Sequence, residues 1–187
     1  MDTFSQVSSV IGQAGRRGAL MISMDCNHPD IEDFIDAKKN TDKLEGCNIS
    51  VRTDGKFIKN SPLIRKLAAN NWDYAEPGIL YWDNINKHNL LSEYIENGEF
   101  EYAGVNPCAE EPLPAGGSCL LGAINLSEFV EKPFTDEAYF DIMAFRKAVK
   151  IAIRALNDVL DEGLELHPLD IQRKTVREWR QIGLKIA

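Results

Sequence analysis

The sequence predicts an α/β fold in a single domain, and three observations support this class. Short apolar segments of strand length alternate with helical patterns along the chain, as in folds where helices cover a sheet. The chain has 187 residues, of which 44% are hydrophobic, so it can bury one sizeable core. It contains no repeat, low-complexity tract or interdomain linker.

The first half of the chain is expected to alternate helices with strands. Asp2 can cap the first helix and Gly15 can end it, because apolar residues recur between them at helical spacing. Pro29 is expected at the first position of the second helix. The Asp-Gly pair at 54–55 is expected to close the second strand as a turn. The expected elements are helix 2–14, strand 18–25, helix 28–40, strand 47–55 and helix 61–71.

The second half is dominated by one long helical pattern that ends at Gly163. Its apolar side is expected in the core and consists of Phe140, Met143, Val149, Ala152, Ile153, Leu156, Val159 and Leu160. The last segment predicts a helix, or a helix leading toward a strand that the chain does not complete. The expected elements are strand 77–86, helix 89–98, a strand-like start within 100–111, an apolar element at 118–130, helix 136–162 and the last segment at 167–187.

Charge and cysteine content exclude several classes of function. The 29 acidic and 21 basic residues give a net charge of −8, which argues against a nucleic-acid partner. No run approaches the roughly 18 apolar residues of a membrane-spanning helix, and the first residues do not resemble a secretory leader, so we expect a cytoplasmic protein without a membrane partner. The four cysteines form no C-x-x-C pair and the three histidines are scattered, so we expect free thiols and no metal site.

The stretch "NPCAEEPLPAGGSC" at 106–119 carries the candidate chemistry. In an extended segment Asn106, Cys108 and Glu110 would point to one side, about 7 Å apart along the strand. That spacing is too wide for all three to touch one small ring, so the segment must curl. Pro107 keeps it out of a central ladder, and the glycines at 116–117 permit a sharp return.

The chemistry depends on the state of the Cys108 thiol. An ionic nucleophile needs a neighbouring cation, whereas Glu110 and Glu111 favour the neutral thiol. A neutral thiol can instead lose a hydrogen atom and become a thiyl radical. A nearby carboxylate can accept a substrate hydroxyl proton, and an amide such as Asn106 can hold sugar hydroxyls. Without further context, Cys108 and Cys119 would more often be structural.

At these residues the chain resembles the catalytic large subunit of ribonucleotide reductase, whose active-site loop has the form Asn-x-Cys-x-Glu. The segments "GQAGRRGALMISMDCNHPDIEDFI", "NISV", "PGILYWDNIN" and "CLLGAINLSEFV" also resemble family segments in the same order. The resemblance implies that Cys108 carries the thiyl radical that abstracts the ribose 3'-hydrogen. It implies that Glu110 is the base for the 3'-hydroxyl and that Asn106 binds and orients the ribose. Cys119 resembles the family's redox cysteine, which forms a disulfide with an upstream partner as the 2'-hydroxyl leaves.

The resemblance also implies the architecture. Residues 1–187 are expected to be a fragment of the catalytic barrel domain, a partial α/β barrel taken from ten strands around a finger loop at about 105–119. We find no upstream cysteine placed to pair with Cys119, no substrate-phosphate loop, no C-terminal cysteine pair and no nucleotide-cone domain. The expectation is a fragment that cannot turn over by itself.

The proline before Cys108 and the spacing of 11 positions to Cys119 resemble the adenosylcobalamin-dependent branch, class II. This branch implies adenosylcobalamin as cofactor, a ribonucleoside di- or triphosphate as substrate and a thioredoxin-type or dithiol reductant. Deoxynucleotide and ATP effectors are expected to bind outside this segment.

Three alternatives remain open. The first is the class I branch, in which a metal-radical partner subunit supplies the radical. The second is a non-catalytic nucleotide-binding module derived from the barrel. The third is another thiyl-radical enzyme such as a glycyl-radical lyase, which needs a glycyl loop that this chain lacks. Cys26 and Cys47 match no family catalytic position and are expected to be small buried hydrophobes.

Overall fold

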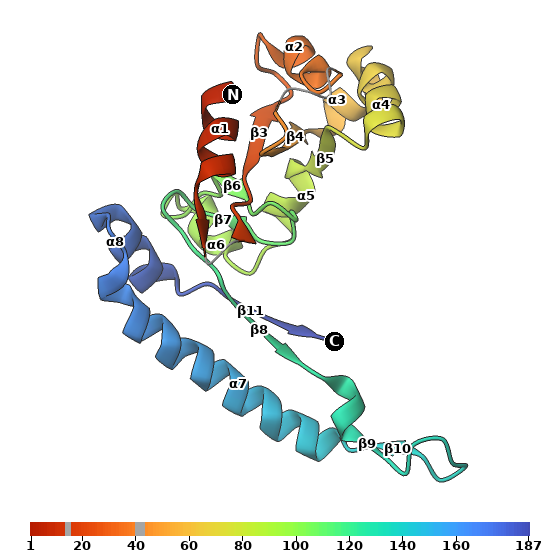
Figure 1. Ribbon diagram of the computed structural model, residues 1–187, viewed down its shortest axis with the longest axis vertical. Helices are drawn as coiled ribbons and strands as arrows, with labels where there is room; N and C mark the ends of the chain where they lie inside the picture. Colours follow the sequence, from red (N-terminus) through yellow and green to blue (C-terminus); the bar gives the residue numbers. More distant parts are fainter. Residues whose placement is uncertain (14–15, 40–43) are drawn as a thin grey trace. The chain divides into compact units, whose positions relative to one another are not determined.

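The computed structural model describes residues 1–13, 16–39 and 44–187, with the side chains of Gln13, Arg16 and Arg17 left aside. The chain forms two compact units, Met1–Pro112 and Leu113–Ala187, each built from helices and short strands (Figure 1). The α/β class is therefore confirmed. Within the described ranges the strands form separate small sheets and no closed barrel, as expected for part of a barrel.

A parallel sheet organises the first unit. Its strands β3 (Met21–Asp25), β4 (Asn48–Thr53) and β5 (Gly78–Tyr81) lie in that order, with β4 in the centre. Each connection returns the chain to the same end of the sheet, which is the pattern of an α/β unit. The expected third strand was too long, because its second half forms the helix α5 (Trp82–Lys87).

Four more helices follow the strands of this unit: α2 (Ile31–Asp36), α3 (Gly55–Asn60), α4 (Leu63–Tyr74) and α6 (Ser92–Glu96). The helix α3 was missed, because Asp54 is its cap and not part of a simple turn. The Asp54 carboxylate accepts a hydrogen bond of 2.6 Å from the Phe57 amide. Pro29 lies before α2 and not at its first position. The buried cluster of this unit consists of Cys26, Ile31, Phe34, Ile35, Leu44, Cys47, Ile49, Val51, Phe57 and Leu67.

The first helix, α1 (Asp2–Val10), buries two serines instead of the apolar residues that recur along it. Its buried residues are Ser5 and Ser8, whereas Val10 is 82% exposed. Ser8 Oγ donates to the Gly46 carbonyl at 2.6 Å, and the Gly46 amide donates to Ser5 Oγ at 3.0 Å. This close approach needs glycine, because a Cβ at position 46 would lie 2.4 Å from the Ser5 carbonyl oxygen.

The ends of α1 also differ from the expected ones. Met1 and not Asp2 occupies the cap position, and the helix ends at Val10. Residues 14–15, where the helix was expected to end, lie outside the described residues. The chain continues as β1 (Gly12–Gln13) and β2 (Arg16–Arg17), which pair antiparallel.

The second unit is a parallel strand pair joined by helices. Strands β8 (Leu120–Ile124) and β11 (Ile182–Ile186) pair in parallel, so the last segment does complete its strand. Between them lie η1 (Leu126–Phe129), β9 (Val130–Glu131), β10 (Tyr139–Phe140), α7 (Ile142–Gly163), η2 (Leu164–Leu166) and α8 (Asp170–Trp179).

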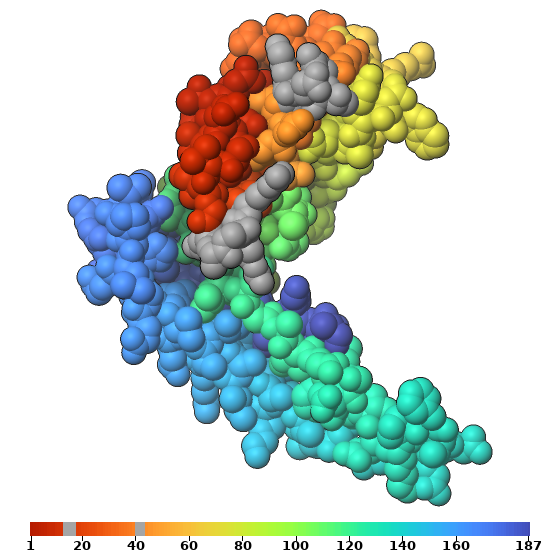
Figure 2. Space-filling model, in the orientation of Figure 1, coloured from red at the N-terminus to blue at the C-terminus, as the bar shows by residue number. Residues whose placement is uncertain are grey.

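The long helix α7 begins later than expected and is less buried. Asp141 caps it by accepting hydrogen bonds from the Met143 and Ala144 amides. Residues 136–140, which were expected in the helix, instead belong to the hairpin of β9 and β10. Of its expected core residues only Leu160 is buried, and it packs with Leu164 and Val176. Figure 2 shows α7, in light blue, at the surface along most of its length.

No helix in the described part of the chain combines the length and apolar character needed to cross a membrane.

Candidate functional site

The loop that contains Cys108 is a tight hairpin. Strands β6 (Gly104–Val105) and β7 (Pro112–Leu113) pair with each other at its base. The Ala109 amide donates to the Asn106 carbonyl at 2.9 Å, which closes a β-turn with Pro107 at its second position and Cys108 at its third. Ala109 follows in the left-handed region with a φ of 66°, which turns the chain back. The predicted curl is confirmed.

Asn106 holds this hairpin closed. Its backbone amide donates to the Glu111 carbonyl at 3.2 Å, and its side-chain Oδ1 accepts from the Glu111 amide at 3.0 Å. The carboxamide oxygen already accepts this one hydrogen bond, whereas the Nδ2 amino group, for which no bond to a described residue is found, can donate to a ligand. The proposed contact of Asn106 with a sugar hydroxyl would then use Asn106 as the donor.

Cys108 and Glu110 lie exposed on the same hairpin. Within the described part of the chain neither side chain has a hydrogen-bond or ion-pair partner. The structure brings Asn106, Cys108 and Glu110 into one hairpin loop, and no other residue of that loop bonds to the thiol or to the Glu110 carboxylate.

Two residues near the hairpin, Tyr102 and Arg52, were not predicted from the sequence. The Tyr102 ring meets the Phe100 ring edge-on at 4.9 Å, and burial together with the Glu111 carboxylate raises the pKa of its hydroxyl. Arg52, on β4, donates from Nη1 to the Ala103 carbonyl at 3.4 Å. The one signal for Arg52 in the sequence was a charged residue inside a predicted strand.

Cys119 belongs to the second unit, directly before β8, and is half-buried. The turn that precedes it is closed by the Gly117 amide, which donates to the Pro114 carbonyl at 2.9 Å. Gly116 adopts a φ of 73°, so the sharp return expected at the two glycines is confirmed.

Cys26 and Cys47 are buried, as expected for structural thiols, and burial raises the pKa of both. Cys26, Cys47 and Cys108 carry free thiols. Within the described ranges, histidine, cysteine and carboxylate side chains form no group that could hold a metal ion.

Comparison with known families gives a match to the ribonucleotide reductase barrel domain over residues 1–62 and 53–186. Together these ranges cover almost the whole chain. The chain belongs to this family. The family assignment made from the Asn106–Glu110 motif and its flanking segments is confirmed.

Several curated proteins are similar to this ribonucleotide reductase barrel segment. A vitamin B12-dependent ribonucleoside-diphosphate reductase of Thermoplasma acidophilum is 33% identical over 211 residues, covering 100% of this chain and 26% of the relative. A vitamin B12-dependent ribonucleotide reductase of Streptomyces avermitilis is 28% identical, covering 94% of this chain and 22% of the relative. A vitamin B12-dependent ribonucleoside-diphosphate reductase of Mycobacterium tuberculosis is 28% identical, covering 98% and 28%. The chain thus spans about a quarter of the length of these relatives.

Proposed function

We propose that this chain carries the radical-bearing loop of an adenosylcobalamin-dependent ribonucleotide reductase, which reduces ribonucleotides to deoxyribonucleotides. The observation that carries the proposal is the exposed Cys108 thiol, which has no bonding partner among the described residues, in the hairpin turn that Asn106 closes. Family membership supports the reaction, and the names of the similar proteins support the cobalamin branch over the metal-radical branch.

Each residue of the loop has a defined role in this proposal. A thiyl radical on Cys108 takes the hydrogen atom from the 3'-carbon of the ribose, while Glu110 accepts the proton of the 3'-hydroxyl. Asn106 donates from Nδ2 to a sugar hydroxyl and keeps the turn closed. The 2'-hydroxyl takes a proton from one of two thiols, one of them Cys119, and leaves as water. The two thiols form a disulfide, and their two electrons and remaining proton make the new carbon–hydrogen bond at the 2'-carbon. Cys108 then returns its hydrogen atom to the 3'-carbon, and Glu110 returns the proton to the 3'-oxygen.

The chemistry that adenosylcobalamin supplies when bound is homolysis of its cobalt–carbon bond, which provides the radical. The residue of this chain that fits this group is Cys108. A neutral thiol can give up a hydrogen atom, and the position of Cys108 in the turn leaves the sulfur accessible.

The remaining partners follow from the reaction. The substrate is a ribonucleoside di- or triphosphate, and a thioredoxin-type protein or a small dithiol returns the disulfide to thiols. Deoxynucleotide and ATP effectors bind outside this segment. The free thiols of the structure suit a cytoplasmic setting.

Nucleotide reduction by the intact protein tests the proposal. With adenosylcobalamin and dithiothreitol, and without a second subunit, we expect deoxynucleotide formation by the wild type and no measurable formation by Cys108→Ser. Because Cys108 is exposed, the substitution should leave the melting temperature unchanged, and circular dichroism checks this.

The other outcomes identify the alternatives. Activity that requires a metal-loaded partner would assign the protein to the class I branch. Nucleotide binding without any turnover would indicate a non-catalytic module. Turnover that survives Cys108→Ser would remove the radical role of this loop.

A further inference from the structure

Arg52 is a charged side chain in a strand whose other central residues are buried. It lies on β4, the middle strand of the parallel sheet, between Asp25 on β3 and Leu80 on β5. Its neighbours Val51 and Thr53 are fully buried. The Arg52 Nε is buried as well and has no hydrogen-bond partner. The function proposed above assigns no role to this guanidinium.

The guanidinium makes two contacts that connect the sheet to the Cys108 loop. Nη1 donates to the Ala103 carbonyl at 3.4 Å, across 51 positions of sequence. The guanidinium carbon lies 5.1 Å from the centre of the Trp82 ring, a cation–π distance. Ala103 is the residue directly before β6. Strand β6 contacts β3, which is the neighbour of β4 in the parallel sheet.

We propose that Arg52 is a positioning residue that fixes the stem of the hairpin and thereby the place of the Cys108 thiol. The path runs from Arg52 through the Ala103 carbonyl into β6, whose next residue is Asn106, the closing residue of the turn. A radical thiol needs a fixed distance to the carbon from which it takes hydrogen. The inference rests on the proposed function, since it assigns a task to Arg52 within that reaction.

The Nε atom argues against a purely stabilising role. A buried donor without an acceptor lowers stability, and an unbranched apolar side chain in its place removes that penalty. A residue retained only to stabilise the sheet would not need a guanidinium here. Trp82 instead orients the planar group, so that Nη1 points at the Ala103 carbonyl.

Two substitutions of Arg52 test the two contacts of its guanidinium. Arg52→Met keeps the length and loses both contacts. Arg52→Lys keeps the charge, but an ammonium group is not planar, so it cannot lie over the Trp82 ring and donate to the Ala103 carbonyl as the guanidinium does. The matched control is Arg65→Met, because Arg65 is an exposed arginine on α4.

Two measurements on the intact protein test the proposal. The first is amide hydrogen exchange, because the Asn106, Ala109 and Glu111 amides are hydrogen-bonded inside the hairpin and report on its opening. We expect exchange of these amides to be about fivefold faster in Arg52→Met and Arg52→Lys, with β3 and β4 unchanged. The second is turnover, for which we expect kcat to fall roughly 10- to 100-fold with KM nearly unchanged. Arg65→Met should match the wild type in both.

The outcomes separate the inference from the proposed function. Faster hairpin exchange in a protein whose wild type shows no turnover would support the positioning contact and reject the reductase function. A wild type that turns over, with hairpin exchange and kcat unaltered in Arg52→Met, would overturn the inference. A lower melting temperature with faster exchange across the whole sheet would also overturn it, because Arg52 would then be an ordinary structural residue.

Discussion

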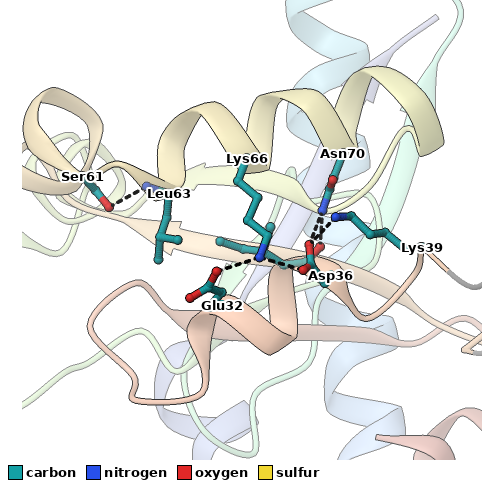
Figure 3. A network of polar contacts seen from close by, with 8 residues as sticks. Glu32, Asp36, Lys39, Ser61, Leu63, Lys66 and Asn70 are labelled. Carbon is teal, nitrogen blue, oxygen red and sulfur yellow. Dashed lines mark hydrogen bonds and ion pairs between the residues drawn. The ribbon is translucent and has the colours of Figure 1, made fainter.

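Asp36 is the residue whose ionisation most clearly depends on the fold. Burial raises its pKa, but hydrogen bonds from Lys66, Asn70 and Lys39 outweigh this and lower the pKa to about 2, from a usual value of 3.8 (Figure 3). Lys66 Nζ lies 2.7 Å and Lys39 Nζ 3.0 Å from its carboxylate, and Asn70 Nδ2 donates at 2.9 Å. These contacts join α2 to α4, which lie side by side.

This shift predicts a loss of stability in acid. Because the folded state binds the Asp36 proton less readily than the unfolded state, the contribution is fully present above the usual pKa of 3.8 and is lost as pH falls toward about 2. Urea unfolding at several pH values should show a smaller change over this range in Asp36→Asn than in the wild type. Asp33→Asn, on the same helix but exposed, is the control and should follow the wild type. Equal pH dependence in all three proteins would contradict the assignment.

The residues of the candidate site could be predicted only where the chemistry is local. Pro107 and the alternation of Asn106, Cys108 and Glu110 predicted a curled loop, because a turn depends on neighbouring residues. The hydrogen bond from the Glu111 amide to Asn106 Oδ1 could not be predicted, since it follows from the closed turn itself. Arg52 was missed because its contact spans 51 positions.

Among the elements, α7 depends on its cap residue, Asp141, which directly precedes the helix. The Asp141 carboxylate accepts from the Met143 amide at 3.0 Å and from the Ala144 amide at 2.9 Å, two donors that the helix itself cannot satisfy. We expect Asp141→Ala to lower the free energy of unfolding of this unit by about 1 kcal/mol. Denaturant unfolding followed by circular dichroism measures it.

The control for this cap is Asp158→Ala, which removes an exposed carboxylate from the interior of the same helix. It should change stability by less than about 0.5 kcal/mol, as surface substitutions usually do. If both variants lose the same amount, the effect comes from the charge of the helix and not from the cap.

Element types were predicted better than their ends and faces. Strand β3 was predicted from its short, mostly apolar segment, and β4 from the segment that the Asp-Gly pair closes. Helix α4 was predicted because its apolar spacing is regular. Regular apolar spacing predicted the helix α1, but the residues that it buries are serines. Its serines lie against the Gly46 backbone, a close approach that depends on a distant glycine and leaves no periodic signal. For α7, capping by Asp141 decided the start, and periodicity alone placed it too early.

At the scale of the whole molecule, the two units differ in how much apolar surface they bury. In Met1–Pro112 the buried cluster draws on α2, β4, α3 and α4, and Leu67 and Val51 are completely buried. In Leu113–Ala187 the cluster consists of Leu160, Leu164 and Val176, with Leu120 and Ile182 packed against it. Because stability follows buried apolar area, the second unit should open more readily.

Hydrogen exchange on paired cavity variants tests this difference. Leu67→Ala and Leu160→Ala each remove a buried leucine from one unit, at a cost of about 2–5 kcal/mol. The cluster of the second unit is smaller, so the same loss removes a larger share of its stability. Leu160→Ala should therefore remove most protection from hydrogen exchange in α7, α8 and β11, while β3 to β5 keep theirs. Leu67→Ala should accelerate exchange in β3 to β5 and leave α7 as in the wild type. Equal acceleration in both units by either variant would mean that the chain unfolds as one cooperative unit, and the separate description of the two units would then fail.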